Sequence, residues 1–285
     1  MQSVSASTLV SHRILLGCNV VDGMLNGFYT QGITEIAGEA GSGKTQIALI
    51  LSLQCSLPIE SGGLNGNTAY LCCGEGDFPI KRLSQLANIY NTKYNKDNPK
   101  INFLENIHIE TNYHVEQLLD TLQHKIPEIC QKHGVRLLVI DSIGGILRSE
   151  YNTTESKEMK ERTYILFKIA AQLKRLADAY SMCVIVINQV TATGFDEKEK
   201  SCVNDTTPTL GLAWSHCVNT RILLKRDLLM DLNQVEPINQ DATTEKENQP
   251  TNFKSLRQMS VIFSPVVPPS TCKYQICTEG IKGLK

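Results

Sequence analysis

The chain has 285 residues, enough for one large domain or two small ones, and 41% of them are hydrophobic, which supports a substantial core. A charged fraction of 20% with ordinary Gly and Pro contents excludes a wholly disordered or collagen-like chain. Lys and Arg total 28 against 29 Asp and Glu, so no net positive charge draws the chain to nucleic acid, and contact with DNA would need local loops or a partner.

The amino-terminal residues and the cysteines indicate an intracellular protein, cytosolic or nuclear. Residues 1–7 have neither the basic flank nor the apolar stretch of a signal peptide, and no apolar run approaches the roughly 20 residues that span a bilayer. The ten cysteines show no Cys-x-x-Cys spacing, and several lie in apolar runs. This usage is typical of buried reduced thiols, not of zinc ligands.

Short apolar runs alternate with helical patterns up to residue 188. In chain order we expect a strand at 32–37, a helix at 44–57, a strand at 68–73, a helix at 79–90, a strand at 106–110, a helix at 115–132, a strand at 135–141, a helix at 158–180 and a strand at 182–188. The buried stripe of the last helix is marked by Ile165, Ile169, Leu173, Leu176 and Ala177. The alternation predicts an α/β fold with a mostly parallel central sheet and helices on both faces.

Beyond residue 188 the pattern changes. Strands are expected at 217–224, 258–263 and 273–278 with no helix between them, as an antiparallel C-terminal extension of the sheet. Polar stretches at 91–100, 191–207 and 231–252 interrupt the elements, and we expect the latter two to be disordered loops. We therefore predict a single domain over residues 1–285, with a short amino-terminal segment at 1–15.

A phosphate-binding loop of the form G-x-x-x-x-G-K-T lies between the first predicted strand and helix. It consists of Gly38, Glu39, Ala40, Gly41, Ser42, Gly43, Lys44 and Thr45. Glycines let the backbone amides wrap a phosphate, and the helix amino end adds partial positive charge. Lys44 is expected to bind the outer phosphates and Thr45 to ligate magnesium, so the sequence predicts Mg²⁺-ATP as cofactor.

A second magnesium-binding residue is expected at Asp141, which ends the apolar strand at 135–141. A carboxylate at that place either holds magnesium through water or only caps a following helix, and the P-loop favours the first role. A GTPase is disfavoured, because residues 95–98 read Asn-Lys-Asp-Asn and lack the last Asp of a guanine-reading motif. No Arg-rich lid typical of small-molecule kinases is apparent.

Further motifs accompany this pair: Glu75-Gly76-Asp77-Phe78-Pro79 after a strand, Asn188-Gln189-Val190, Gln46 directly after the P-loop, and Phe263-Ser264-Pro265. Together they resemble the ATPase core of the RecA-type recombinases, eukaryotic branch, and within it the recombinase paralogues. The resemblance extends from Leu16 to Gly283 and implies a RecA-type P-loop ATPase core.

The resemblance implies roles at matching positions. Glu75 would be the general base that orients the attacking water, or else a surface carboxylate near a turn. Gln189 would sense the γ-phosphate, or else cap a strand. Arg82 would stack on adenine, or else be a solvated helix arginine. His216 would face a neighbouring subunit's nucleotide, or else be a satisfied interior histidine.

Several departures from the family pattern also matter. The family carries an amino-terminal helix-hairpin-helix domain and a Phe-x-x-Ala linker that docks on the next subunit, and neither is expected here, because the core begins near Leu16. Phe167-Lys168-Ile169-Ala170 lies within a helix, so we expect it to pack in the core. The family's carboxylate over the neighbour's nucleotide falls at Phe263. Its basic residue in the first DNA loop, after Arg148, falls at Thr154.

The loop after Gln189 corresponds to the family's second DNA loop, and its acidic residues outnumber its basic ones. The basic residues are Lys198 and Lys200, and the acidic residues are Asp196, Glu197, Glu199 and Asp205. We therefore expect weak binding of single-stranded or branched DNA by the chain alone. What the resemblance implies is a weak DNA-dependent ATPase in the nucleus. It would act in homologous-recombination repair of double-strand breaks, in a heteromeric paralogue complex that assists the main recombinase filament on single-stranded DNA.

A different class of function stays open: a non-hydrolysing, nucleotide-bound module that only scaffolds a partner. For assembly we expect this chain to be the acceptor end of a heterodimer, taking another paralogue's linker at an exposed edge around Ala69, Tyr70 and Leu71. The alternative is that residues 1–11 supply a self-docking strand.

Overall fold

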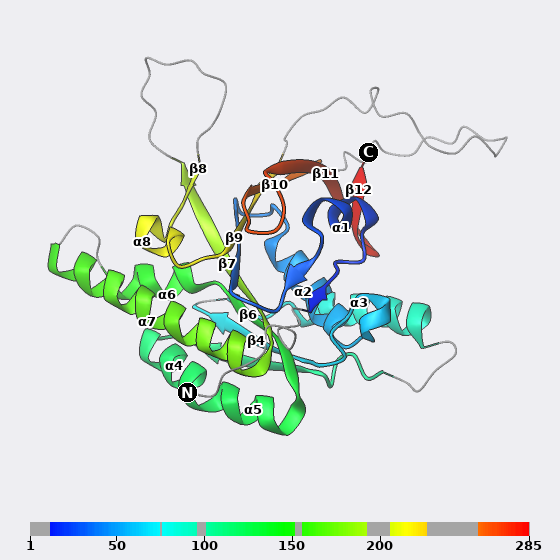
Figure 1. Ribbon diagram of the computed structural model, residues 1–285, viewed down its shortest axis with the longest axis horizontal. Coiled ribbons are helices and arrows are strands. Elements are labelled where there is room, and N and C mark those ends of the chain that lie inside the picture. Colours follow the sequence, from blue (N-terminus) through cyan, green and yellow to red (C-terminus); the bar gives the residue numbers. More distant parts are fainter. Residues whose placement is uncertain are drawn as a thin grey trace, which may run out of the picture.

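The computed structural model describes residues 12–74, 76–95, 101–151, 156–192, 206–226 and 256–284. These residues form an α/β structure around one large sheet (Figure 1). Its strand order is β12–β11–β10–β9–β3–β7–β6–β4–β5. The strands are β3 (Ile33–Gly38), β4 (Asn67–Cys73), β5 (Ile107–Asn112), β6 (Val135–Asp141), β7 (Cys183–Ala192), β9 (Thr220–Arg226), β10 (Arg257–Phe263), β11 (Ser270–Cys277) and β12 (Gly280–Leu284).

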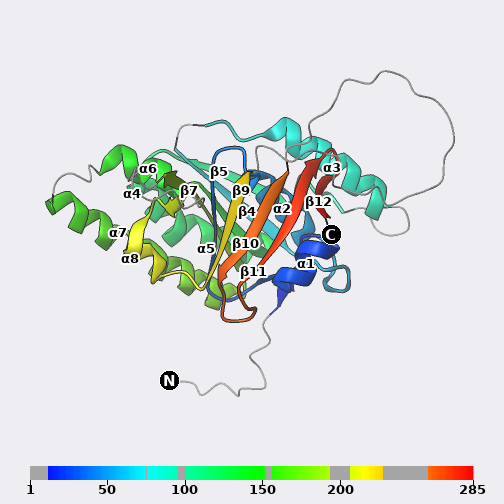
Figure 2. The same cartoon turned by 90° about the horizontal axis from the view of Figure 1, so that it is seen from above.

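Parallel pairing joins β9, β3, β7, β6, β4 and β5, and antiparallel pairing joins β9 to β10, β10 to β11 and β11 to β12. Figure 2 shows β9 to β12 side by side as the C-terminal extension. Two short pairings are added, β1 (Arg13–Ile14) with β2 (Phe28–Tyr29) and β8 (Thr206–Pro208) with β7. The predicted parallel sheet with an antiparallel extension is confirmed.

Helices cover both faces of the sheet. They are α1 (Asn19–Leu25), α2 (Lys44–Cys55), α3 (Ile80–Tyr94), α4 (Val115–Asp120), α5 (Ile126–His133), α6 (Ile143–Glu150), α7 (Ser156–Tyr180) and α8 (Gly211–Ser215), with a 3₁₀ turn at Ile59–Ser61 and a π-helical turn at Thr121–Lys125 between α4 and α5. No helix in the described part is long and apolar enough to cross a membrane.

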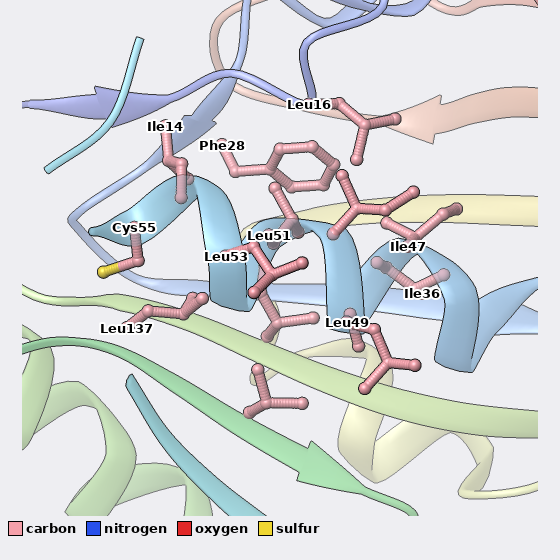
Figure 3. Close-up of a cluster of buried hydrophobic side chains, with 14 of the residues drawn as sticks. Ile14, Leu16, Phe28, Ile36, Ile47, Leu49, Leu51, Leu53, Cys55 and Leu137 are labelled. Carbon is pink, nitrogen blue, oxygen red and sulfur yellow. The ribbon is translucent and has the colours of Figure 1, made fainter. Parts of the chain in front are cut away.

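Two hydrophobic clusters fill the space between helices and sheet, one per face. On the first face α2 is buried on every side from Ile47 to Cys55, and Phe28, Ile36 and Leu137 surround it (Figure 3). A helix that is apolar all round has to lie inside a protein. On the second face α7 packs Leu173 and its neighbours against β3 and β7. The first helix after the P-loop is therefore anchored in the core from Ile47 to Cys55.

The long elements fall where the sequence predicted them, and the differences have local causes. Two elements were not predicted: α6, whose second and third residues are glycines with low helix propensity, and β12, which contains two glycines. Helices α1 and α8 and the short strands β1, β2 and β8 were also not predicted. Helix α3 continues to Tyr94, so the polar stretch predicted from residue 91 is wrong over its first four residues, and residues 96–100 lie outside the described part.

The predicted loop at 191–207 is also wrong at its two ends, because residues 191–192 complete β7 and residues 206–207 belong to β8. These residues are in strands because their backbones pair with each other, although their side chains are polar or small. The remainder of that stretch and residues 231–252 lie outside the described residues. The nine described cysteines are all free and seven of them are buried, as predicted.

The expected docking edge is at the wrong strand. Ala69, Tyr70 and Leu71 are each 1% exposed, because β4 is paired on one side with β6 and on the other with β5. The strand at 106–110 was foreseen, but its place outside β4 was not, since strand order cannot be read from apolar runs. The open edge at this end of the sheet is β5.

Candidate nucleotide-binding site

The P-loop connects β3 to α2, as predicted, and lies at the carboxyl edge of the parallel strands. Gly43 directly precedes the helix with φ of 109°, a conformation that side chains disfavour. A Cβ at this residue would also lie 2.9 Å from Cδ1 of Ile276. Ser42 is fully buried, whereas Glu39, Ala40 and Gly41 are exposed. The loop thus presents its backbone outward over the amino end of a buried helix.

The Lys44 ammonium folds back onto the loop and donates hydrogen bonds to the carbonyl oxygens of Gly38 at 2.8 Å and Glu39 at 2.7 Å. Burial lowers the pKa of Lys44, and the nearby carboxylates of Asp141 and Glu39 partly offset this effect. Among the described residues no carboxylate forms an ion pair with it. A cation held only by neutral carbonyls fits an anionic ligand such as a phosphate.

Thr45 and Asp141 lie together, as predicted for a magnesium site. The Thr45 hydroxyl donates to Oδ2 of Asp141 at 2.8 Å, and the Tyr70 hydroxyl donates to the same oxygen at 2.7 Å. No group of three or more His, Cys, Asp or Glu side chains in the described part could hold a metal by itself. Magnesium usually takes one or two protein ligands beside phosphate and water, so the donor set fits Mg²⁺ bound with a nucleotide.

A cleft of about 360 Å³ opens beside these groups, and Gln189 lines it together with Thr45 and Asp141. Glu75 lies outside the residues that the structure describes, but its neighbours Gly74, Gly76 and Asp77 line the same cleft. Its assignment as general base stays a prediction. Cys72 also lines the cleft, and burial raises the pKa of its thiol to about 11, so this cysteine stays protonated and does not act as a nucleophile.

The Gln189 side chain is tied to the segment that precedes the first predicted DNA loop. Its Oε1 accepts a hydrogen bond from Arg148 at the end of α6 at 2.6 Å, and its carbonyl accepts one from the Thr209 amide. Thr209 also donates to Asn188, whose amide donates to the buried Glu35. The cleft is therefore connected by hydrogen bonds to both regions from which DNA loops are expected to emerge.

Glu35 lies within β3 and is fully buried, where it pairs with Arg221 of β9 at 2.5 Å. Phe263 places its ring 5.2 Å from the Arg221 guanidinium. At the position where the recombinase family has a carboxylate, this chain thus has an aromatic ring packed on its own buried ion pair.

Arg82 lies next to the P-loop helix but is not a solvated arginine. Its Nε donates to Gln46, and its two terminal nitrogens donate to the carbonyls of Cys277, the last residue of β11, and Thr278, the first residue of the turn that follows. Desolvation lowers its pKa. A planar guanidinium held at three points can present a flat face, which is what stacking on a base requires.

Strands of the C-terminal extension brace the P-loop. Tyr274 of β11 is fully buried and donates its hydroxyl to the Ser42 carbonyl at 2.6 Å. Arg257 of β10 donates to the Gly41 carbonyl at 3.2 Å. The roles of Tyr274, Arg257 and Tyr70 at this site were not predicted, because a tyrosine or arginine in a strand does not reveal which distant group its side chain contacts.

Three other sequence interpretations have mixed outcomes. His216 follows α8 and is exposed, so the interior alternative is wrong. Phe167 lies within a helix as expected, but it is 47% exposed, so its predicted core packing is wrong. It falls on the solvent side of α7, while Ala170 faces inward. Thr154 and the charged residues at 196–205 lie outside the described part.

Comparison with known proteins now decides the family. The family model for Rad51 matches residues 8–231. The chain belongs to the Rad51 family. Among its Rad51-family relatives, the DNA repair protein XRCC3 homolog of Arabidopsis thaliana is 33% identical over 95% of this chain and 93% of its own length. DNA repair protein XRCC3 of Bos taurus is 32% identical over 95% of this chain and 75% of its own length. Human DNA repair protein RAD51 homolog 2 is 29% identical over 91% of this chain and 76% of its own length. The predicted RecA-type recombinase resemblance is confirmed.

Proposed function

We propose that this Rad51-family chain binds Mg²⁺-ATP and acts as a recombinase paralogue in homologous-recombination repair of DNA double-strand breaks in the nucleus. The observation that carries the proposal is the Thr45–Asp141 hydrogen bond beside an ammonium that has no carboxylate partner among the described residues, in a chain similar to XRCC3 repair proteins. Phosphate would be held by Lys44 and the loop amides, and magnesium by Thr45 and Asp141.

Slow, DNA-stimulated hydrolysis is the activity we propose for this site. Glu75 would orient the attacking water, and Gln189 would report the γ-phosphate state to Arg148 and Thr209 through its hydrogen bonds. Each of these groups moves or holds a proton or a charge without covalent chemistry, as expected for phosphoryl transfer to water. Arg82 would stack its fixed guanidinium on the adenine base of ATP.

A second function has its own supporting observation. Phe263 stands where the family has a carboxylate over a neighbour's nucleotide, and it packs on Arg221. A chain that cannot complete a neighbour's site could use bound ATP only to fix the shape of a partner surface. In that case turnover would be irrelevant to its role.

Assembly is proposed to be one-sided, within a heteromeric paralogue complex that assists the main recombinase on single-stranded DNA. The docking strand is β5, in place of the edge first expected at 69–71, because β5 is the edge strand next to β4 in the described sheet, whereas β4 is paired on both sides. A linker from another paralogue would add to β5 and place an apolar anchor in the small hollow that Ala69, Leu71, Ile126 and Ile129 line beneath it. One-sided docking of this kind would produce a heterodimer and not a filament, because a filament needs both docking surfaces on every subunit.

Steady-state ATP hydrolysis separates the two functions. We expect slow turnover that single-stranded DNA and a partner paralogue increase, and a loss of about 10²–10⁴-fold in the single-turnover rate for Glu75→Gln. An exposed carboxylate away from the cleft, Glu60→Gln, serves as the control. ATP binding with no turnover under any condition would favour the scaffold, and no ATP binding at all would contradict both functions.

A further inference from the structure

The outer side of β5 offers backbone groups that no other described residue pairs with. The carbonyls of Asn106 and Asn112 accept hydrogen bonds from the Thr68 and Gly74 amides on the β4 side. Because backbone direction alternates along a strand, Ile109 and Thr111 direct their amides and carbonyls away from β4. The Ile109 side chain is 40% exposed. An extended segment can therefore pair with this strand.

A groove of about 470 Å³ lies at the carboxyl end of this edge, next to the apolar hollow. Its lining includes Glu110, Asn112, Glu116, Asp120, Thr121 and Lys125, from β5, α4 and the π-helical turn. Glu110, Thr121 and Lys125 line both the groove and the hollow, so the two are continuous. One segment lying along β5 would cross both.

The carboxylates of this groove exceed its cations. Glu110 is paired with Lys125 at the boundary between hollow and groove. Glu116 and Asp120 are both exposed and stand four residues apart on α4, where like charges repel. The cation nearest Asp120 is His124 at 3.9 Å, which is charged only when protonated. With three carboxylates in its lining against the one ammonium of Lys125, the groove is acidic, and an external cation would relieve the repulsion.

Two further features of the groove point to a ligand. The Asn112 side chain is 1% exposed, and its amide nitrogen has no hydrogen-bond partner within the described part of the chain, although its oxygen accepts a bond from Thr121. Buried donors without partners are rare in native proteins, and this N–H group needs an acceptor, which a backbone carbonyl of a docked segment can supply and a basic side chain cannot. The groove is also bordered by a π-helical turn, a distortion that occurs frequently at functional sites.

We propose that this acidic groove selects the partner linker by charge: the segment that docks on β5 carries basic side chains next to its apolar anchor. The anchor fills the hollow, the backbone pairs with Ile109 and Thr111, and the basic side chains lie against Glu116 and Asp120. The inference rests on the proposed one-sided assembly and adds the chemical class of the partner segment. Charge would thereby discriminate between paralogue linkers that share the same apolar anchor.

Fluorescence polarisation with labelled synthetic peptides tests this directly on the whole chain. The probes contain Phe-Thr-Thr-Ala flanked on both sides by Arg, Gln or Glu pairs, and a fourth replaces Phe by Ala. We expect the Arg peptide to bind about threefold to tenfold more tightly than the Gln peptide at low salt, from two exposed ion pairs. The difference should disappear at high salt. Glu116→Lys with Asp120→Lys should reverse the order of the Arg and Glu peptides.

A matched control changes the same net charge elsewhere, with Glu60→Lys and Asp178→Lys, both exposed. Circular dichroism confirms that each variant is folded before binding is measured. If all peptides with Phe bind equally and the Phe→Ala peptide does not bind, the acceptor edge stands and charge selection is wrong. If no peptide depends on Phe, the docking site proposed on β5 is itself wrong. Equal effects of the control and groove variants would also overturn the charge assignment.

Discussion

The hydroxyl of Tyr274 holds the P-loop by a hydrogen bond to the Ser42 carbonyl, so Tyr274→Phe should weaken both folding and ATP binding. The substitution preserves the buried ring and removes only the donor to the Ser42 carbonyl, 2.6 Å away. Both residues are fully buried, so water cannot replace the lost donor. Burial raises the pKa of Tyr274 well above its ordinary value, so the hydroxyl is a donor at every pH that the protein tolerates.

A buried acceptor left without its partner costs about 1–3 kcal/mol. We expect the free energy of unfolding to fall by that amount in urea titrations. If about 1.4 kcal/mol of the cost is a bias of the P-loop away from its binding conformation, the Kd for ATP rises about tenfold. Calorimetric ATP titration of the folded variant measures this. Tyr90→Phe, a buried tyrosine in α3 whose ring packs on Phe103, is the control.

An unchanged unfolding free energy together with an unchanged Kd would refute the reasoning that the C-terminal extension braces the P-loop. A loss of stability with an unchanged Kd would limit the role of Tyr274 to folding.

Three other predictions follow, two from the structure and one from the charges in the sequence of the second DNA loop. Arg221→Met leaves the buried Glu35 carboxylate without its cation and should lower the unfolding free energy by about 3–5 kcal/mol. Adding Glu35→Leu to this variant should recover much of the lost stability. Equal stability of wild type and Arg221→Met in urea titrations would contradict the prediction. Burial and His133 lower the pKa of His108 below its ordinary 6.5, so the native state binds fewer protons than the unfolded chain, and stability should fall as pH drops through about 6.5. His108→Gln should lose this pH dependence in thermal melts, and an unchanged profile of melting temperature against pH would refute it. The isolated chain should bind single-stranded DNA with a salt slope of only about −1 to −2, whereas steeply salt-dependent nanomolar binding would contradict the acidic loop composition.

The sequence predicted the parts of the fold that depend on local pattern. Apolar runs located the parallel strands, and the G-x-x-x-x-G-K-T spacing located Lys44 and Thr45, because each signal is contained in one short segment. Asp141 was predicted as a magnesium-binding residue because a carboxylate that ends an apolar strand in a chain with a P-loop is expected there, and this role stays a prediction. Its contact with Thr45 is confirmed by the hydrogen bond between them.

The remaining features depend on contacts between distant segments. Tyr274 reaches a carbonyl 232 residues away in sequence, and Arg82 is held by carbonyls 195 and 196 residues away. No local pattern encodes such distances. The wrong docking edge has the same origin, because strand order places β5 outside β4. Phe167 was misjudged because a Phe on a helix suggests burial, whereas the turn of α7 directs it to solvent.

The central claim, that the cleft beside Lys44 binds Mg²⁺-ATP, is tested most directly by calorimetric titration of ATP into wild type, Lys44→Ala and a control, Lys132→Ala, with magnesium or with EDTA. Lys132 is an exposed lysine of α5 paired with Glu128. The account predicts magnesium-dependent binding for wild type and control. In Lys44→Ala it predicts a loss of roughly 1.5–3 kcal/mol of binding free energy, the value of a charge-assisted phosphate contact. Equal affinity of wild type and Lys44→Ala would contradict it.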